Sequence, residues 1–261
     1  NLRLEDRRVL SWFTKRTLSK IQGLFTIPFW EVLVPQCCPT EPIILACVLA
    51  LGSCHRERTI NWRNQDSFGS AGVKFSSLWY YGEAIRMLRG AQLDGSRHST
   101  RIILIGCLLF IAIEYMQQRH AQGRLHLRNG LNILSSQRSR GLLQSSGDSA
   151  DDWLTEAFNR LDLQTELLLH TTKDKDLSLY KHQLSGKRGL ASLGSLDEAR
   201  SWLDYLMSQA FQLQRQSYLA EDSENVTQLF QLSDRKRQLQ QDLASWLRGF
   251  KAFKLQTSAN L

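Results

Sequence analysis

Three acidic residues in a short stretch, Asp148, Asp151 and Asp152, have the types and spacing of a metal site. Carboxylate oxygens are the ligands that Mg²⁺ prefers, and all-helical enzymes use acidic clusters of this kind. The stretch stands directly before an apolar, periodic segment, where acidic side chains also cap free backbone amides and complement the helix dipole. No second acidic metal motif occurs in the chain. We therefore favour a capping role over metal binding.

The histidines and cysteines offer no clear catalytic or metal site. His120 and His126 are six residues apart, which places them on different faces of a helix. The five cysteines form no C-x-x-C pair, and their odd number favours a reducing compartment. Cys47, Cys54 and Cys107 lie in apolar runs, where a free thiol behaves as a small hydrophobic group. Nucleophile, phosphate-loop and dinucleotide motifs are also missing. We expect no enzyme and no cofactor in this chain.

Glu114 is the most informative single residue, because it ends a long apolar stretch. From Ile102 to Ile113 every residue except Gly106 is apolar, so a helix there has no polar face and must be buried. A carboxylate at the end of such a helix must be paired, protonated or exposed. We expect a structural ion pair with an arginine such as Arg119 or Arg124. The alternative is a polar anchor in a ligand pocket.

The ligand-pocket hypothesis has three further candidate residues. His126 follows Glu114 within the same stretch and allows the same two interpretations. Trp79 and Tyr80 lie on a separate predicted helix that could pack beside it. The sequence thus gives four candidate ligand-binding residues, namely Trp79, Tyr80, Glu114 and His126.

Two helices must position these residues. The apolar segment is much shorter than the roughly 20 residues that cross a bilayer, and Arg101 and Glu114 bound it, so we expect a core helix and no membrane span. Apolar residues between Leu125 and Leu134 recur with helical spacing among arginines, which predicts an amphipathic helix. A turn near residues 118–122 would join the two into a buried central hairpin.

Helical periodicity continues along the chain, and no alternating strand pattern competes with it. Predicted helices cover approximately residues 3–21, 43–57, 74–93, the 99–134 hairpin, 153–169, 195–213 and the chain from 233 onward. All four prolines fall between residues 28 and 42, which predicts a bent connector with one turn around FWEVL. Polar loops are expected at 59–72, 135–152 and 171–195. The fold class is therefore all-α, a single large domain (1–261) of about eight helices around the central hairpin.

The distribution of charge and the spacing of apolar residues indicate which partners the chain could bind. The net charge is +8, but residues 101–140 hold a local +5 and residues 141–180 a local −5, a pattern of solvated faces rather than of one nucleic-acid footprint. From Leu196 to Leu213 apolar residues recur every three and four positions as in a heptad seam. We favour burial of this seam within the domain, with a homodimer as the alternative.

Five sequence blocks, in this order and spacing, resemble one protein family. The blocks are FWEVLVPQCCPTEPIILACVLALGSCH, WYYGEAIRMLRG, CLLFIAIEYMQQRHAQGRLHLRNGLNIL, FNRLDLQTELL and SLDEARSWLDYLM, which together span about Phe29 to Met207. They are similar to the regulatory region of fungal binuclear zinc-cluster transcription factors. One departure is that this family usually has a glycine near Gln118.

The resemblance implies an all-helical, nuclear regulatory domain that controls transcription. The six-cysteine cluster that would bind two zinc ions and DNA is absent from this sequence, so DNA contact is expected only through a separate zinc-cluster domain. The expected partners are a small-molecule effector or a coregulator protein. The alternatives are a helical interaction scaffold, which the lack of a 34–47-residue repeat disfavours, and an all-α enzyme, which the missing motifs disfavour.

Overall fold

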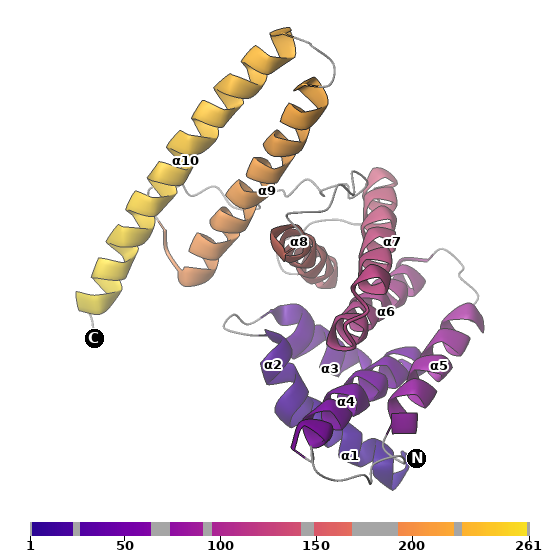
Figure 1. The fold of residues 1–261 in the computed structure, drawn as a ribbon. Helices are drawn as coiled ribbons and strands as arrows, with labels where there is room; N and C mark the ends of the chain where they lie inside the picture. The colour runs from indigo at the N-terminus through magenta and orange to yellow at the C-terminus, as the bar shows by residue number, and fades with distance from the viewer. Residues whose placement is uncertain are drawn as a thin grey trace. The chain divides into compact units, whose positions relative to one another are not determined.

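The structure is a computed structural model that describes residues 2–22, 27–63, 74–90, 96–141, 149–168, 193–221 and 226–259. The regular elements in these ranges are all helical, so the all-α prediction is confirmed (Figure 1). The chain divides into two compact units, Asn1–Phe158 and Asn159–Leu261. Each unit is described by itself. Asp148 and most of the three expected loops lie outside the described residues.

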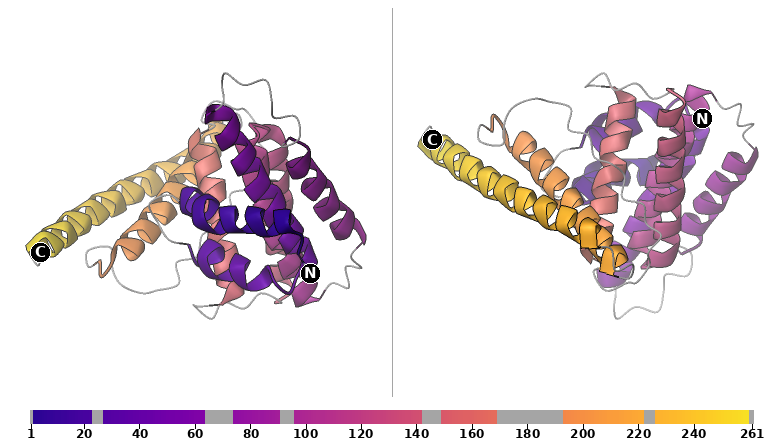
Figure 2. Two further views of the ribbon diagram at one scale, coloured as in Figure 1. Left: turned by 90° about the horizontal axis from the view of Figure 1, so that it is seen from below. Right: turned by 90° about the horizontal axis from the view of Figure 1, so that it is seen from above.

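The first unit is a bundle of helices, seen from two further directions in Figure 2. Its N-terminal run is helical throughout, with a π-helical turn at Phe13–Thr17 between two α-helices. A second π-helical turn, Phe29–Leu33, is the turn expected around FWEVL, and it continues into a short α-helix. The α-helices of this unit are α1 (Leu4–Trp12), α2 (Leu18–Gln22), α3 (Val34–Cys37), α4 (Pro42–Arg63), α5 (Lys74–Gly90), α6 (Arg97–Met116), α7 (His120–Ser139) and the first part of α8 (Ala150–Leu168).

Helix α4 shares the centre of this unit with the predicted hairpin. Every residue from Ala46 to His55 is buried, and α4 packs against α1, α5 and α6. Gly52 permits a close approach to α1, because a Cβ atom there would lie only 3.1 Å from Val9 Cγ1 and 3.2 Å from Phe13 Cβ. The sequence predicted this helix as apolar, but did not predict that so many elements would surround it.

Four consecutive polar residues at the end of the apolar run of α4 each hold a different neighbouring element. The pairs are His55 Nδ1 with Thr17 Oγ1 at 2.9 Å, Arg56 with Glu5, Glu57 with Ser76 and Ser77, and Arg58 with the backbone carbonyl of Met116. Thr59 also bonds back to the carbonyl of His55 within the helix. These contacts explain why α4 continues to Arg63, where the sequence predicted a loop from residue 59.

The predicted central hairpin consists of α6 and α7. Helix α6 begins at Arg97, earlier than expected, because the Ser96 side chain accepts a hydrogen bond from the Ser99 amide at 3.1 Å and caps the helix. Helix α7 continues past Leu134 to Ser139, so the linker expected from residue 135 is shorter. By length and composition α6 would also pass as a membrane span, as core helices often do. Its central residues, Leu104, Ile105, Leu108, Leu109 and Ile111, are fully buried.

Helix α5 packs with a different rotation from the one its pattern predicted. Leu78, Tyr81, Ile85 and Leu88 recur in the sequence with helical spacing, which predicts one inner stripe, but the Leu78 side chain is 54% exposed. Ser77, Tyr80 and Ala84 are the buried residues instead. The carboxylate of Glu57 explains the burial of a serine here, because Ser77 donates to it both from its backbone amide at 3.1 Å and from its hydroxyl at 2.7 Å.

The second unit contains the end of α8 and a pair of long helices, α9 (Leu196–Glu221) and α10 (Val226–Ala259). The pair is antiparallel (Figure 1), and the Trp246 indole in the C-terminal half of α10 donates to the Ala199 carbonyl near the start of α9 at 2.8 Å. Leu213, Ala220 and Leu232 form a buried cluster between them. The predicted burial of the heptad seam is confirmed for Ala199, Leu206 and Leu213. Leu196, at the start of the seam, is 50% exposed.

Candidate functional site

Glu114 is the residue at which α5, α6 and α7 meet. It lies in the last turn of α6 and is only 1% exposed. The Tyr81 hydroxyl of α5 donates a hydrogen bond of 2.5 Å to Glu114 Oε1. Burial, and then this hydrogen bond, raise the pKa of Tyr81. The tyrosine therefore stays a proton donor to the carboxylate.

The second partner of Glu114 is Arg119, which stands directly before α7. Its Nε atom lies 2.6 Å from Glu114 Oε2, and its Nη2 donates to Oε1 at 3.3 Å. The same guanidinium lies over the Tyr81 ring, 5.6 Å from the centroid, as a cation–π contact. The predicted structural ion pair with Arg119 is thus present. The buried charge is thus paired, as it must be, although both hydrogen bonds go to Oε1 and, among the described residues, Oε2 has only the ion-pair contact with Arg119.

The turn between α6 and α7 brings Arg119 back to Glu114. Its backbone amide donates to the carbonyl of Glu114 at 2.8 Å. The reversal requires Gln118 to adopt φ +62°, the left-handed region that favours glycine. The sequence predicted the turn but placed it slightly later, at residues 118–122. The observed geometry also explains why a glycine would suit this position.

His126 joins the same region through an aromatic stack. Its ring stacks on that of Phe110, with centroids 5.4 Å apart and planes inclined by 21°, and Phe110 makes an edge contact with Tyr81 at 5.1 Å between centroids. Burial lowers the pKa of His126, and the nearby Glu114 carboxylate opposes this in part. Two of the predicted residues, Glu114 and His126, are therefore parts of one cluster. We call Tyr81, Phe110, Glu114, Arg119 and His126 the Glu114 cluster.

Trp79 and Tyr80 contact a different element, α1. The Tyr80 hydroxyl donates to Asp6 Oδ1 at 2.5 Å, and the Arg3 guanidinium lies 4.9 Å above the ring of Trp79. Trp79 is 51% exposed. Neighbouring residues on a helix point about 100° apart. The tyrosine at Glu114 is consequently Tyr81, which the sequence analysis did not name as a site residue.

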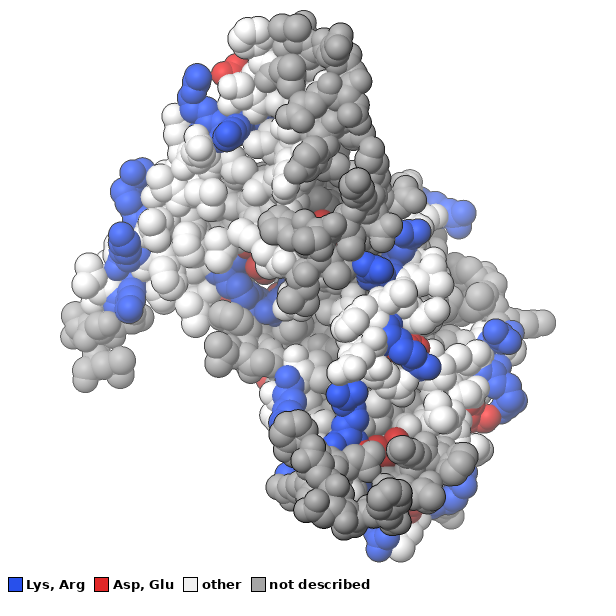
Figure 3. All heavy atoms as spheres, in the orientation of Figure 1, with Lys and Arg blue, Asp and Glu red and all other residues white. Residues whose placement is uncertain are grey.

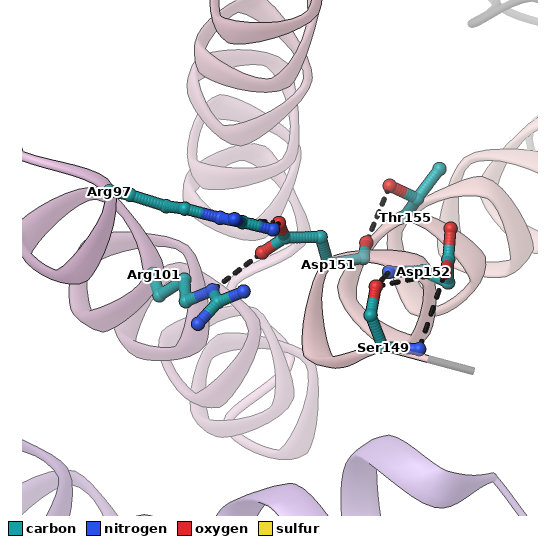
Figure 4. A network of polar contacts seen from close by, with 6 residues as sticks. All are labelled: Arg97, Arg101, Ser149, Asp151, Asp152 and Thr155. Carbon is teal, nitrogen blue, oxygen red and sulfur yellow. Dashed lines mark hydrogen bonds and ion pairs between the residues drawn. The ribbon is translucent and has the colours of Figure 1, made fainter. Parts of the chain in front are cut away.

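The acidic stretch before α8 forms a second polar network (Figure 4). Asp151 is 2% exposed and accepts hydrogen bonds from Arg97 Nε at 2.9 Å and Arg101 Nε at 2.6 Å, both in the first turns of α6. Asp152 and Ser149 cap the helix reciprocally: the Asp152 amide donates to Ser149 Oγ, and the Ser149 hydroxyl donates to Asp152 Oδ2 at 2.8 Å. The capping prediction is thus confirmed for Asp152, whereas Asp151 fastens α8 to α6.

The described residues do not fit a zinc cluster. No group of three or more His, Cys, Asp or Glu side chains that could hold a metal ion occurs among them. Burial raises the pKa of the Cys38 and Cys107 thiols to about 11, which disfavours the thiolate that zinc requires. Cys38, Cys47 and Cys54 are buried and pack within the helical core.

The family model described as "Fungal specific transcription factor domain" matches residues 9–260, nearly the whole chain. The chain belongs to this family of fungal transcription factor domains. No curated protein and no solved structure matched it.

Proposed function

We propose that this chain is the regulatory domain of a fungal zinc-cluster transcription factor, that it acts in the nucleus, and that its role is not catalytic. Membership of the fungal-specific transcription factor domain family supports a transcription regulator. DNA contact and the two zinc ions would belong to a separate zinc-cluster domain. The role that we propose for this chain is to control the transcriptional output.

The observation that supports control by an effector is the composition of the Glu114 cluster. A carboxylate that is 1% exposed is held by one tyrosine from α5 and one arginine from the α6–α7 turn. The arginine is itself 43% exposed, so an incoming group can reach it. An anionic effector could draw Arg119 away, and a cationic one could replace it. Either exchange would change how α5, α6 and α7 are fastened together.

The proposed mechanism is a shift between two arrangements of this helical body, one of which exposes an activation surface. A small effector or a coregulator protein shifts such an equilibrium only by its different affinity for the two states. Conversion from 1:99 to 99:1 requires a ratio of about 10⁴ between those affinities. An effector that displaces Arg119 from Glu114 in one of the two states would supply part of this ratio, because a lost partner of a buried charge costs several kcal/mol.

A thermal-shift screen of metabolites against the whole chain tests the proposal. A ligand at 100 times its Kd adds about 2.7 kcal/mol to stability, which raises the melting temperature by several degrees. We expect Glu114→Gln to abolish that shift. Tyr205→Phe, a change on α9, serves as the control and should retain it. A shift that is equally large in Glu114→Gln would contradict an effector site at this cluster.

The same screen addresses the other two predicted ligand residues. Trp79 is exposed on α5 and Tyr80 is tied to α1, so a ligand there would contact Trp79 first. A shift lost in Trp79→Ala and retained in Glu114→Gln would assign the effector to the Trp79 face instead.

A further inference from the structure

The end of helix α10 extends past its partner helix. The hydrogen bond from Trp246 to the Ala199 carbonyl fixes the alignment of the antiparallel pair. Helix α9 begins at Leu196, one turn before Ala199, whereas α10 continues from Trp246 to Ala259. At 1.5 Å per residue this is about 20 Å of helix, most of it beyond the start of α9 (Figure 1).

This part of α10 exposes large apolar side chains among cations. Leu247 is 46% exposed and Leu255 is 72% exposed. Arg248 and Lys251 lie between them and are also exposed. Positions 247, 251 and 255 follow one another at a spacing of four, so they share one face of the helix. We call Leu247, Arg248, Lys251 and Leu255 the α10 face.

The charge of this segment has one sign. From residue 243 to the end of the sequence there are three basic residues and no acidic one. In Figure 3 the blue side chains along this end of α10 are surrounded by white atoms, and no red atom lies beside them on the side shown. On the inner side, Trp246 and Phe250 stack with centroids 5.2 Å apart and planes inclined by 6°. The hydrogen bond from Trp246 to the Ala199 carbonyl of α9 sets the rotation of α10 at this point, so the α10 face is presented in a defined way.

We propose that the α10 face docks an acidic amphipathic helix of a partner protein. Leu247 and Leu255 are about 12 Å apart along the axis, which matches apolar anchors two turns apart on a partner helix. Carboxylates beside those anchors would pair with Arg248 and Lys251. Charge complementarity would fix the orientation and speed association, and burial of the two leucines would supply affinity.

Two other ligand classes fit this surface less well. A helix that lies on an anionic membrane needs a broad apolar face, and here cations separate two large apolar side chains. Nucleic acid would engage the cations but would leave both leucines in water. The proposal is independent of an effector at the Glu114 cluster, because it concerns another helix and another kind of ligand.

Fluorescence anisotropy with the whole chain tests the proposal. The probe is a labelled peptide of about 18 residues that forms a helix, with leucines on one stripe and glutamates beside it. We expect saturable binding, at least tenfold weaker binding by the double variants Leu247→Ser/Leu255→Ser and Arg248→Glu/Lys251→Glu, and no binding of a peptide with lysine in place of glutamate. Because all four side chains are exposed, the variants should keep their helical circular dichroism.

Control variants lie elsewhere on the same helix. Phe230→Ser removes a side chain that is 71% exposed, and Arg237→Glu reverses a charge that is 71% exposed, so neither should change the peptide affinity. Equal affinity of both double variants and wild type would overturn the proposal. So would failure of the peptide to bind while phosphatidylserine vesicles, duplex DNA or a second copy of the chain binds this face at physiological salt.

Discussion

The hydroxyl of Tyr81 and the carboxylate of Glu114 are joined by a hydrogen bond of 2.5 Å, although the two residues belong to different helices. Arg119 adds the second partner from the turn that follows α6. One buried carboxylate therefore connects α5, α6 and the start of α7. A substitution of any of these three side chains should therefore change the contacts of the other two.

Tyr81→Phe should lower the free energy of unfolding by about 1.5–3 kcal/mol, the usual contribution of a hydrogen bond to a charged group. The ring and its contact with Phe110 remain, so the loss reports the hydroxyl alone. Chemical denaturation of the variant and of wild type measures the difference. Tyr205→Phe is the matched control, with an expected change within about 0.5 kcal/mol. Identical denaturation midpoints for Tyr81→Phe and wild type would show that the bond contributes nothing.

Gln118→Gly should stabilise the protein by about 1 kcal/mol, because a non-glycine residue in the left-handed region costs about 1–2 kcal/mol and the flexibility of glycine offsets only part of this. The same substitution at Gln122, within α7, should destabilise it by about 0.5–1 kcal/mol. Thermal melts of both variants measure whether each substitution raises or lowers the stability. A loss of stability in both would mean that the turn is not strained at Gln118.

Gly130→Ala should destabilise the protein, although alanine favours helices by about 1 kcal/mol. A Cβ atom at Gly130 would overlap the fully buried Phe158 ring, and overpacking of this kind costs about 1–3 kcal/mol. Gly82→Ala is the matched control on α5, where a Cβ atom would meet nothing within 4 Å, and it should stabilise by about 0.5–1 kcal/mol. Equal melting temperatures for the two variants would contradict the tight contact between α7 and Phe158.

Stability should fall as the pH decreases below about 6.5. Burial lowers the pKa of both His55 and His126, so the unfolded chain takes up protons before the folded one does. The stability that the neutral rings contribute is complete above the unfolded pKa and is lost as the pH falls toward the folded values. Melting temperatures between pH 5 and 7.5 measure the slope. His126→Gln should flatten it, whereas a substitution of the exposed His120 should not.

The sequence predicted what depends on a single helix or on neighbouring residues. The uniformly apolar run from Ile102 to Ile113 could only be a buried helix, and that conclusion holds. The ion pair of Glu114 with Arg119 could also be predicted, because the short turn after Glu114 brings only a few basic residues near its carboxylate. The cap formed by Ser149 and Asp152 also joins residues that are close in the sequence, so it could be predicted as well.

Contacts between elements that are distant in the sequence could not be predicted in this way. The choice of Tyr81 rather than Tyr80 depends on the rotation of α5, which the contacts of Ser77 with Glu57 help to fix. Asp151 contacts Arg97 and Arg101, which lie 54 and 50 residues before it in the sequence. The apolar pattern of α5 also fits a rotation in which Leu78 is buried, and only tertiary packing excludes it.

The most direct test of the central claim is a reporter measurement with the whole chain fused to an unrelated DNA-binding domain in a fungal cell. If the Glu114 cluster controls transcriptional output, Glu114→Gln should change reporter expression several-fold at equal protein abundance. Gly130→Ala, which lowers stability without touching the cluster, should match wild type once abundance is normalised. Expression from Glu114→Gln that equals wild type at equal abundance would contradict the claim.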